Sequence, residues 1–334
     1  MKNKHRRRLK PIPCLLLILI LTIFGFLIYK GVSKKSPTLE KEQQNNIINK
    51  LSKLDYKKDE IENLQDELSD ENINFLVSKE IKRDDFIDIY NDKYYIDQYM
   101  TKYIEYKSKH NDYSSREIVE RVNTHADKAF YTNTEASNEK LDKFVIANKH
   151  YYLSSSYTAP DLTEFDPLYS LYGATYKNEL SEEAMNHFIE LFNQAISEGY
   201  GIKINSAYRS YQTQNKLYNN YVSSDGVKLA DTYSARPGYS EHQTGYAFDV
   251  RNVPNTKDDF EDSKEFDWMQ ENAHKYGFFL RFPKGKEEIT GYQYESWHYR
   301  YCGIECATYI HDTKITFEEY YEYFIRYHNP RNIK

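Results

Sequence analysis

Cysteine is scarce in this chain of 334 residues, which contains only Cys14, Cys302 and Cys306. Cys14 lies at the edge of an apolar N-terminal segment, and the other two thiols are too few for a zinc site built from four cysteines. On a helix the C-x3-C pair would share one face, so packing, a disulfide or a metal are all conceivable. We favour two small packed residues over a disulfide.

A basic excess is also absent, because 45 Lys and Arg against 51 Asp and Glu give a net charge of −6. Proteins that bind nucleic acid usually carry a basic face, so we expect no nucleic-acid partner. Tyrosine, in contrast, is abundant, with 34 residues. We interpret most of these tyrosines as half-buried packing residues. The alternative is an aromatic surface for a sugar or wall polymer.

The N-terminus has the clearest compositional pattern. Residues 1–10 carry six Lys or Arg, and the segment 11–29 that follows has no charge. This length is close to the roughly 20 residues that cross a bilayer, and the basic flank predicts that the N-terminus lies inside. A cleaved signal peptide is the alternative, but no small-x-small cleavage pattern follows. We therefore expect a cytoplasmic tail (1–10), an uncleaved signal anchor (11–29) and an extracellular remainder, held at the cell membrane by a single pass.

A polar linker (30–45) separates this anchor from a region of helical periodicity (46–135). Apolar residues recur there at helical spacing, which predicts several short, charged helices. The heptads are not sustained, so a helical stalk or accessory region is favoured over a coiled coil. The apolar residues that carry this pattern are Ile47, Leu51, Leu54, Ile61, Leu64 and Leu68.

Helices and short strands alternate irregularly from residue 144 onward. The pattern predicts a helix that opens at Ser181, a strand over 202–207 and a helix around 268–276 that stops at Gly277. Such an order favours the α+β class over a doubly wound sheet. We predict a domain over 144–328 with a small mixed or antiparallel sheet and flanking helices.

One short stretch, SEHQTGYAFD (240–249), combines a histidine and an aspartate with a glycine between them. An unbroken strand would point His242 and Asp249 to opposite faces, because side chains alternate with period two. A bend at Gly245 removes that constraint. A carboxylate in an apolar strand is costly unless it is paired or binds a metal. A structural histidine–aspartate hydrogen bond and a pair of metal ligands therefore both stay open for this stretch.

A second stretch, ESWHYR (295–300), places a glutamate three residues before a histidine. Glu295 could act as a general base and His298 as a third metal ligand, if the chain turns between them. Trp297 would contribute an apolar wall. Together the two stretches supply two imidazoles, one carboxylate ligand and one spare carboxylate. The histidines at 110, 150, 187, 274, 311 and 328 are interpreted as surface or packing residues.

These motifs resemble those of a known family. S-x-H-x-x-G-x-A-x-D followed by E-x-W-H is similar to the signature of the VanY-type zinc D-alanyl-D-alanine carboxypeptidases, a family related to L,D-carboxypeptidases and D,D-dipeptidases. The segment SAYRSYQTQ (206–214) resembles a third element of the family, S-x-Y-R-S-x-x-x-Q. The resemblance covers roughly residues 144–312.

The resemblance implies a zinc site and assigns roles within it. It implies that Zn²⁺ is bound by His242, Asp249 and His298, and that Glu295 is the general base. Arg209 is then expected to stabilise an oxyanion or the substrate carboxylate. Contacts with the substrate are expected from Arg209, Gln214, Ser240 and Trp297. No role is carried over to the two C-terminal cysteines.

The expected function is that of a membrane-anchored extracellular metallocarboxypeptidase. It would remove the C-terminal D-alanine from peptidoglycan stem peptides, as a D,D-carboxypeptidase. An L,D-carboxypeptidase acting on tetrapeptide stems is the close second. A non-catalytic wall-binding protein on the same fold is a third possibility, which the presence of all four residues of the site disfavours.

Overall fold

The computed structural model describes residues 37–175, 178–254 and 259–327, and its backbone falls into two compact units, 1–84 and 85–334. Within the described ranges no helix is both long enough and apolar enough to cross a membrane. The predicted anchor and cytoplasmic tail lie outside those ranges. The predicted domain limits stay predictions, although the helices of residues 100–123 belong to the same unit as the sheet.

The first unit contains α2 (Pro37–Lys53), α3 (Lys58–Glu67) and α4 (Asp70–Ser78). Its apolar residues follow the predicted helical spacing, and the side chains of Leu51, Ile61, Leu64 and Leu76 are buried. The hydroxyl of Ser69 accepts a hydrogen bond from the backbone N–H of Asn72 and caps the start of α4. α5 (Arg83–Tyr90) spans the division between the units.

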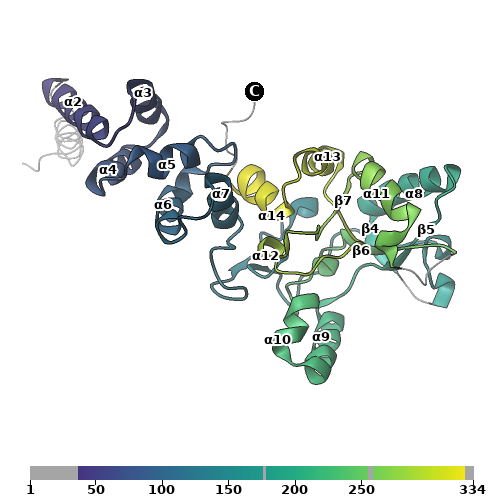
Figure 1. Cartoon of the computed structure of the whole chain (residues 1–334). Coiled ribbons are helices and arrows are strands. Elements are labelled where there is room, and N and C mark those ends of the chain that lie inside the picture. The colour runs from purple at the N-terminus through teal and green to yellow at the C-terminus, as the bar shows by residue number, and fades with distance from the viewer. Residues whose placement is uncertain (1–36, 176–177, 255–258, 328–334) are drawn as a thin grey trace, which may run out of the picture. The chain divides into compact units, whose positions relative to one another are not determined.

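The second unit combines short helices with small sheets, so the predicted α+β class is confirmed (Figure 1). Its main sheet has four antiparallel strands in the order β5-β6-β8-β7. Two further pairs of strands are separate from this sheet, one parallel and one antiparallel. In chain order, the elements before the sheet are α6 (Met100–Lys109), α7 (Ser115–Asn123), β1 (Glu135–Ala136), β2 (Tyr151–Tyr152), β3 (Leu162–Glu164), β4 (Glu179–Ser181) and α8 (Glu182–Ser197). The rest are β5 (Ile202–Ser206), α9 (Tyr211–Asp225), α10 (Val227–Tyr233), β6 (Ala247–Asn252), α11 (Lys264–Asn272), β7 (Phe278–Leu280), α12 (Glu287–Thr290), β8 (His298–Tyr301), α13 (Ile304–Thr313), α14 (Phe317–Tyr320) and the π-helical turn η8 (Tyr321–Arg326).

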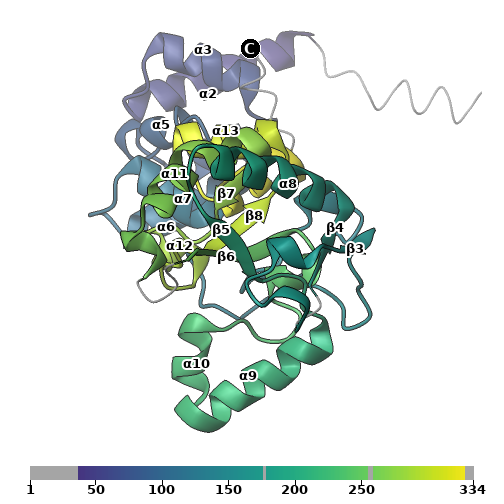
Figure 2. The same ribbon diagram turned by 90° about the vertical axis from the view of Figure 1, so that its right-hand side faces the viewer.

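One face of the central sheet is apolar and the other is polar. Phe248 and Val250 of β6, with Tyr299 and Tyr301 of β8, join a hydrophobic core that also contains buried residues of α8 and α11. Side chains alternate along a strand, so the residues between them point to the opposite face. α9 and α10 pack together and stand off the sheet in both views (Figures 1 and 2).

The structure contains a disulfide between Cys302 and Cys306, so the prediction of two packed thiols is wrong. Cys302 directly follows β8 and Cys306 lies in the first turn of α13. This turn brings their Cα atoms to 5.7 Å, which lies within the range that a disulfide spans. Both side chains are buried, and the bond ties the start of α13 to the end of β8.

Candidate metal centre

The polar face of the sheet presents an aspartate and a histidine side by side. Asp249 of β6 is paired in register with His298 of β8, so both side chains project from the same face. Asp249 Oδ1 lies 3.3 Å from His298 Nδ1. The sheet register thus joins residues that are 49 positions apart in the sequence.

His242 reaches the same point from the loop before β6. The chain bends at Gly245, whose φ of 76° lies in the left-handed region, as the sequence predicted. A Cβ atom at this position would come within 2.7 Å of the Ala159 side chain, so glycine is needed for space as well. The bend places His242 Nε2 3.5 Å from Asp249 Oδ1. The Nδ1–H of His242 donates to the Ala207 carbonyl at 2.7 Å, which leaves Nε2 facing the aspartate.

These three residues form a group that suits a metal ion. His242, Asp249 and His298 each offer a ligand atom, and the three atoms lie within 4.8 Å of one another. Among the described residues, no other group of three or more His, Cys, Asp or Glu side chains meets this criterion. Asp249 Oδ1 is buried and has no hydrogen-bond partner in the described part of the chain. A buried carboxylate oxygen of this kind is typical of a site that binds a cation.

Glu295 lies beside this group, directly before the predicted turn. The backbone N–H of His298 donates to the Glu295 carbonyl at 3.3 Å, and the turn covers Ser296 and Trp297. Glu295 Oε2 is 3.3 Å from His298 Nδ1. Burial raises the pKa of the Glu295 carboxyl, and the hydrogen bond with His298 offsets part of that rise. A carboxylate with a raised pKa is a better proton acceptor, as a general base requires.

Burial and neighbouring charges shift the pKa values of the three ligand residues in different directions. Burial alone would raise the pKa of Asp249, but the two neighbouring imidazoles lower it. Burial lowers the pKa of His242, and the charge of Arg209 lowers it further. For His298, burial acts to lower the pKa, but the neighbouring carboxylates of Asp249, Glu241 and Glu295 raise it. Acidic groups thus surround this imidazole, which makes the site favourable for positive charge.

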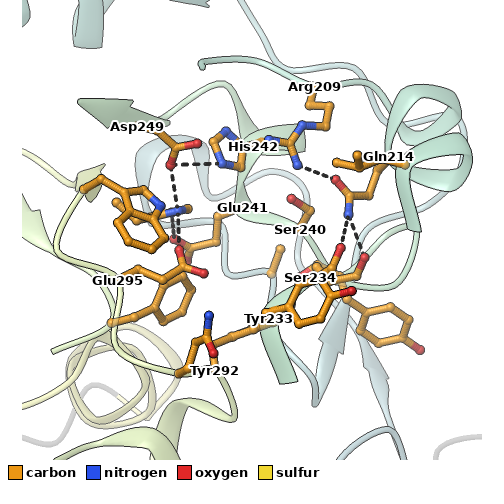
Figure 3. Close-up of a pocket in the computed structure, with 18 of the residues that line it drawn as sticks. Arg209, Gln214, Tyr233, Ser234, Ser240, Glu241, His242, Asp249, Tyr292 and Glu295 are labelled. Carbon is orange, nitrogen blue, oxygen red and sulfur yellow. Dashed lines mark hydrogen bonds and ion pairs between the residues drawn. The ribbon is translucent and has the colours of Figure 1, made fainter. Parts of the chain in front are cut away.

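A cavity of about 310 Å³ opens onto the group (Figure 3). All the site residues predicted from the sequence line it, namely Arg209, Gln214, Ser240, His242, Asp249, Glu295, Trp297 and His298. α9 and α10 form one wall, through Leu217, Tyr221 and Tyr233. The sequence did not single out these wall residues, nor Tyr239 and Tyr292 of the loops, because they belong to no motif with recognisable chemistry.

Gln214 lines the cavity, but protein groups engage its amide. Its side chain is buried, its Oε1 accepts from Arg209 Nη1 at 2.7 Å, and its Nε2 donates to the Ala235 carbonyl at 2.7 Å (Figure 3). Arg209 also donates from Nη2 to Ser206 Oγ at 3.1 Å. Both ends of the amide are therefore occupied by protein groups. Direct contact of Gln214 with substrate stays a prediction. The contacts that the structure contains are those by which Gln214 holds the Arg209 guanidinium.

The other histidines agree with the interpretation as packing or surface residues. His150 is buried, and its ring lies 5.3 Å from that of Phe130. His274 and His311 stack with ring centroids 3.8 Å apart. His328 lies outside the described residues.

Comparison with known proteins identifies the family. The model of the VanY D-alanyl-D-alanine carboxypeptidases matches residues 177–304. A D-alanyl-D-alanine carboxypeptidase of Enterococcus faecium is 33% identical over 216 residues, which cover 64% of this chain and 68% of that protein. The protein YodJ of Bacillus subtilis (strain 168) is 40% identical over 180 residues, which cover 53% of this chain and 66% of YodJ. The alignments thus span about two thirds of each relative.

A solved structure of the LdcB LD-carboxypeptidase shares the same domain. It is 36% identical in sequence and superposes with a TM-score of 0.54, covering 57% of this chain and 91% of LdcB. The chain therefore belongs to the VanY-type family of D-alanyl-D-alanine carboxypeptidases.

Proposed function

We propose that this chain is a zinc-dependent carboxypeptidase that removes the C-terminal D-alanine from peptidoglycan stem peptides. Pentapeptide stems are the substrate that we favour. One observation carries the proposal: His242, Asp249 and His298 converge within 4.8 Å on the wall of a cavity that Glu295 and Arg209 also line. Membership of the VanY-type family supports the reaction class.

The residues fit zinc by their chemistry as well as their spacing. Two imidazoles and one carboxylate are a usual ligand set for catalytic zinc, with a fourth position left for water. When bound, the ion lowers the pKa of this water and polarises the scissile carbonyl. The Nδ1–H of His242 is donated to the Ala207 carbonyl, so Nε2 keeps a lone pair for the ion.

Glu295 would move the proton. Its carboxylate accepts one proton from the attacking water as the new C–O bond forms at the scissile carbonyl carbon. It then passes that proton to the nitrogen of the leaving D-alanine as the C–N bond breaks, so the base returns to its starting state. The raised pKa of Glu295 favours the first transfer, because the carboxylate accepts and holds the proton more readily.

Arg209 would hold the end of the substrate. A guanidinium offers a planar fork that matches a carboxylate, and Gln214 and Ser206 fix its orientation at the cavity wall. We propose that it binds the terminal carboxylate of the peptide, while Ser240 and Trp297 line the remaining space.

The similarity to the LdcB LD-carboxypeptidase favours a second candidate, removal of D-alanine from a tetrapeptide stem. The two reactions differ in the configuration of the residue before the scissile bond. A third candidate, a non-catalytic wall-binding protein, is disfavoured because the three ligands and Glu295 are all in place.

The proposed location is outside the cytoplasmic membrane, with residues 11–29 as the anchor. The Cys302–Cys306 disulfide supports this, since disulfides persist mainly in oxidising compartments. In cell fractionation, the full chain should be in the membrane fraction and accessible to protease from outside, whereas a variant without residues 1–29 should not. Protection of the full chain in intact spheroplasts would contradict the proposed topology.

Defined muropeptides test the activity. The purified full chain would be incubated with tripeptide, tetrapeptide and pentapeptide muropeptides, with and without a chelator, and the products followed by mass spectrometry. We expect release of D-alanine from the pentapeptide, loss of activity with the chelator and recovery with added zinc. Cleavage of the tetrapeptide alone would support the L,D-enzyme. Activity that survives metal removal would refute the zinc site, and a zinc-loaded chain that cleaves none of them would favour wall binding.

A further inference from the structure

The C-terminal helix carries three glutamates that are almost fully buried. Glu318 and Glu319 of α14 and Glu322 of η8 are each at most 2% exposed. A carboxylate is costly to bury unless charged or hydrogen-bonding partners surround it. Glu318 binds Arg281, Glu319 binds Arg116 of α7, and Glu322 lies against His125. Each glutamate therefore connects the helix to a different part of the unit.

Glu318 holds an arginine that reaches toward the metal centre. Arg281 follows β7 directly and is 1% exposed. It donates from Nη1 and Nη2 to the two oxygens of Glu318, at 3.0 and 2.5 Å. Its Nε donates to Glu241 Oε1 at 2.8 Å. The guanidinium thus bridges two buried carboxylates and fixes one relative to the other.

Glu241 faces the ring of His298 with its second oxygen. Glu241 Oε2 lies 3.9 Å from His298 Nε2, and neither atom has another hydrogen-bond partner in the described part of the chain. Glu241 Oε1 is directed to the arginines, because Arg300 Nη1 is also 3.3 Å from it. On the other side of the ring, Nδ1 faces Asp249 and Glu295.

We propose that Glu241 is a positioning residue that accepts the Nε2–H of His298, leaving Nδ1 as the metal-binding atom, and that Arg281 and Glu318 hold Glu241 in place. The proposal rests on the zinc site of the proposed function. A metal-binding histidine usually donates its other N–H to a carboxylate or carbonyl, which selects its tautomer and fixes its ring. His242 uses the Ala207 carbonyl for this purpose, and His298 would use a carboxylate that α14 supports. The C-terminal helix then becomes part of the metal centre, although it does not line the cavity.

The direction of the two arginines makes Glu241→Gln a sharp test. Arg281 donates to Glu241 Oε1 and the Arg300 guanidinium lies 3.3 Å from the same oxygen, so the amide oxygen of the variant would stay toward the two positive charges. The amide NH₂ would then face His298 Nε2 and demand a lone pair there. This arrangement favours the tautomer of His298 that carries its proton on Nδ1. A protonated Nδ1 has no lone pair for a metal ion.

The experiment measures the zinc Kd of the full chain by competition with a chromophoric chelator. We expect Glu241→Gln to raise the Kd about 10- to 100-fold, and to change the absorption spectrum of the cobalt-substituted protein. Glu318→Gln should raise the Kd about three- to tenfold, because it acts through Arg281. Glu319→Gln is the matched control: the same change, on the same helix, at an equally buried carboxylate that binds Arg116 instead.

The control separates positioning from a general loss of packing. Glu319→Gln should keep the zinc Kd within twofold of wild type even if its melting temperature falls. A wild-type Kd in Glu241→Gln, or an equal loss in Glu318→Gln and Glu319→Gln, would overturn the proposal. If Glu241→Gln does not fold, the comparison of Glu318→Gln with Glu319→Gln decides alone. A wild-type chain that binds no zinc would refute the proposed function itself. That result is distinguishable from the variant results that would overturn the positioning role of Glu241.

Discussion

Two buried clusters in the second unit use the same kinds of residue for different ends. The metal-centre cluster comprises His242, Asp249, Glu295 and His298, and the aromatic cluster comprises His125, His150, Tyr151 and Glu322. In both, a glutamate lies within 3.3 Å of a histidine nitrogen. In the metal-centre cluster three candidate ligand atoms converge at the wall of a cavity, and Asp249 Oδ1 has no hydrogen-bond donor among the described residues.

The carboxylate of the aromatic cluster is used by the protein itself. Glu322 accepts hydrogen bonds from the hydroxyls of Tyr99 and Tyr151, and it lies beside His125 and Arg326. Aromatic rings of Tyr99, Tyr151 and Phe130 lie against the two histidines. Residue types alone therefore do not define a metal site. A metal site also requires lone pairs that converge on accessible space.

Glutamate-to-glutamine variants in the two clusters should affect different properties, activity in one cluster and stability in the other. Glu295→Gln is expected to lower D-alanine release on the order of 10³-fold, because it removes the general base, while zinc binding and melting temperature change little. Glu322→Gln should cost about 3 kcal/mol of stability, because it breaks a buried ion pair, and leave activity per folded molecule unchanged at 25 °C. Muropeptide assays and urea unfolding measure the two quantities.

Two outcomes would contradict these expected effects. Glu295→Gln that retains activity within tenfold of wild type would remove Glu295 from the mechanism. A loss of more than tenfold in Glu322→Gln, per folded molecule, would show that the aromatic cluster contributes to the chemistry.

Arginine-to-lysine variants sharpen the contrast at a smaller scale. Arg209→Lys should reduce kcat/KM about 10- to 100-fold, mainly through a higher KM, since lysine lacks the planar fork that matches a carboxylate. Arg326→Lys is the control in the aromatic cluster, where the guanidinium binds Glu322 and Glu135. It should lower the melting temperature and leave KM unchanged. A KM of wild-type size in Arg209→Lys would exclude Arg209 as the carboxylate-binding residue.

The smallest expected effect is a pH dependence of stability that comes from the aromatic cluster. Burial, helped by His125, lowers the pKa of His150 from the ordinary 6.5 to about 4. The unfolded chain therefore binds more protons between these values, so stability is full above pH 6.5 and is lost as the pH falls toward 4. His150→Asn should lose less stability than wild type between pH 6.5 and 4.5, by about 1 to 2 kcal/mol.

Urea unfolding at the two pH values measures this difference. His110→Asn, at the end of α6 and outside the aromatic cluster, should behave as wild type. An unchanged pH slope in His150→Asn would place the titration in other residues.

Much of the candidate site could be predicted from the sequence, because its residues lie in three short motifs. The bend at Gly245 and the turn before His298 follow from local chemistry, glycine for a left-handed residue and a break in strand alternation. For Gln214 the motif predicted a substrate contact, which stays a prediction. The fold adds what the motif did not indicate, namely that both ends of the amide are engaged by Arg209 and Ala235.

Other features depend on partners that are distant in the sequence. Nothing near Glu241 indicates that Arg281, 40 positions away, will bind it, or that Glu318, 77 positions away, will bind the same arginine. The disulfide required Cys302 to end a strand and Cys306 to lie in the first turn of the next helix, which spacing alone did not reveal. His125 belongs to no motif, and only packing places it beside Glu322.

The α+β class and the helical periodicity of the first unit follow from the sequence by itself, because both depend on local periodicity. The sequence also singled out the candidate ligand and base residues, because they lie in short motifs. The tertiary structure decided which atoms face one another. The register of β6 with β8 sets Asp249 beside His298, and the packing of α14 sets Glu318 against Arg281. Such contacts depend on how buried elements satisfy one another's charges, and that balance is set only when the whole unit folds.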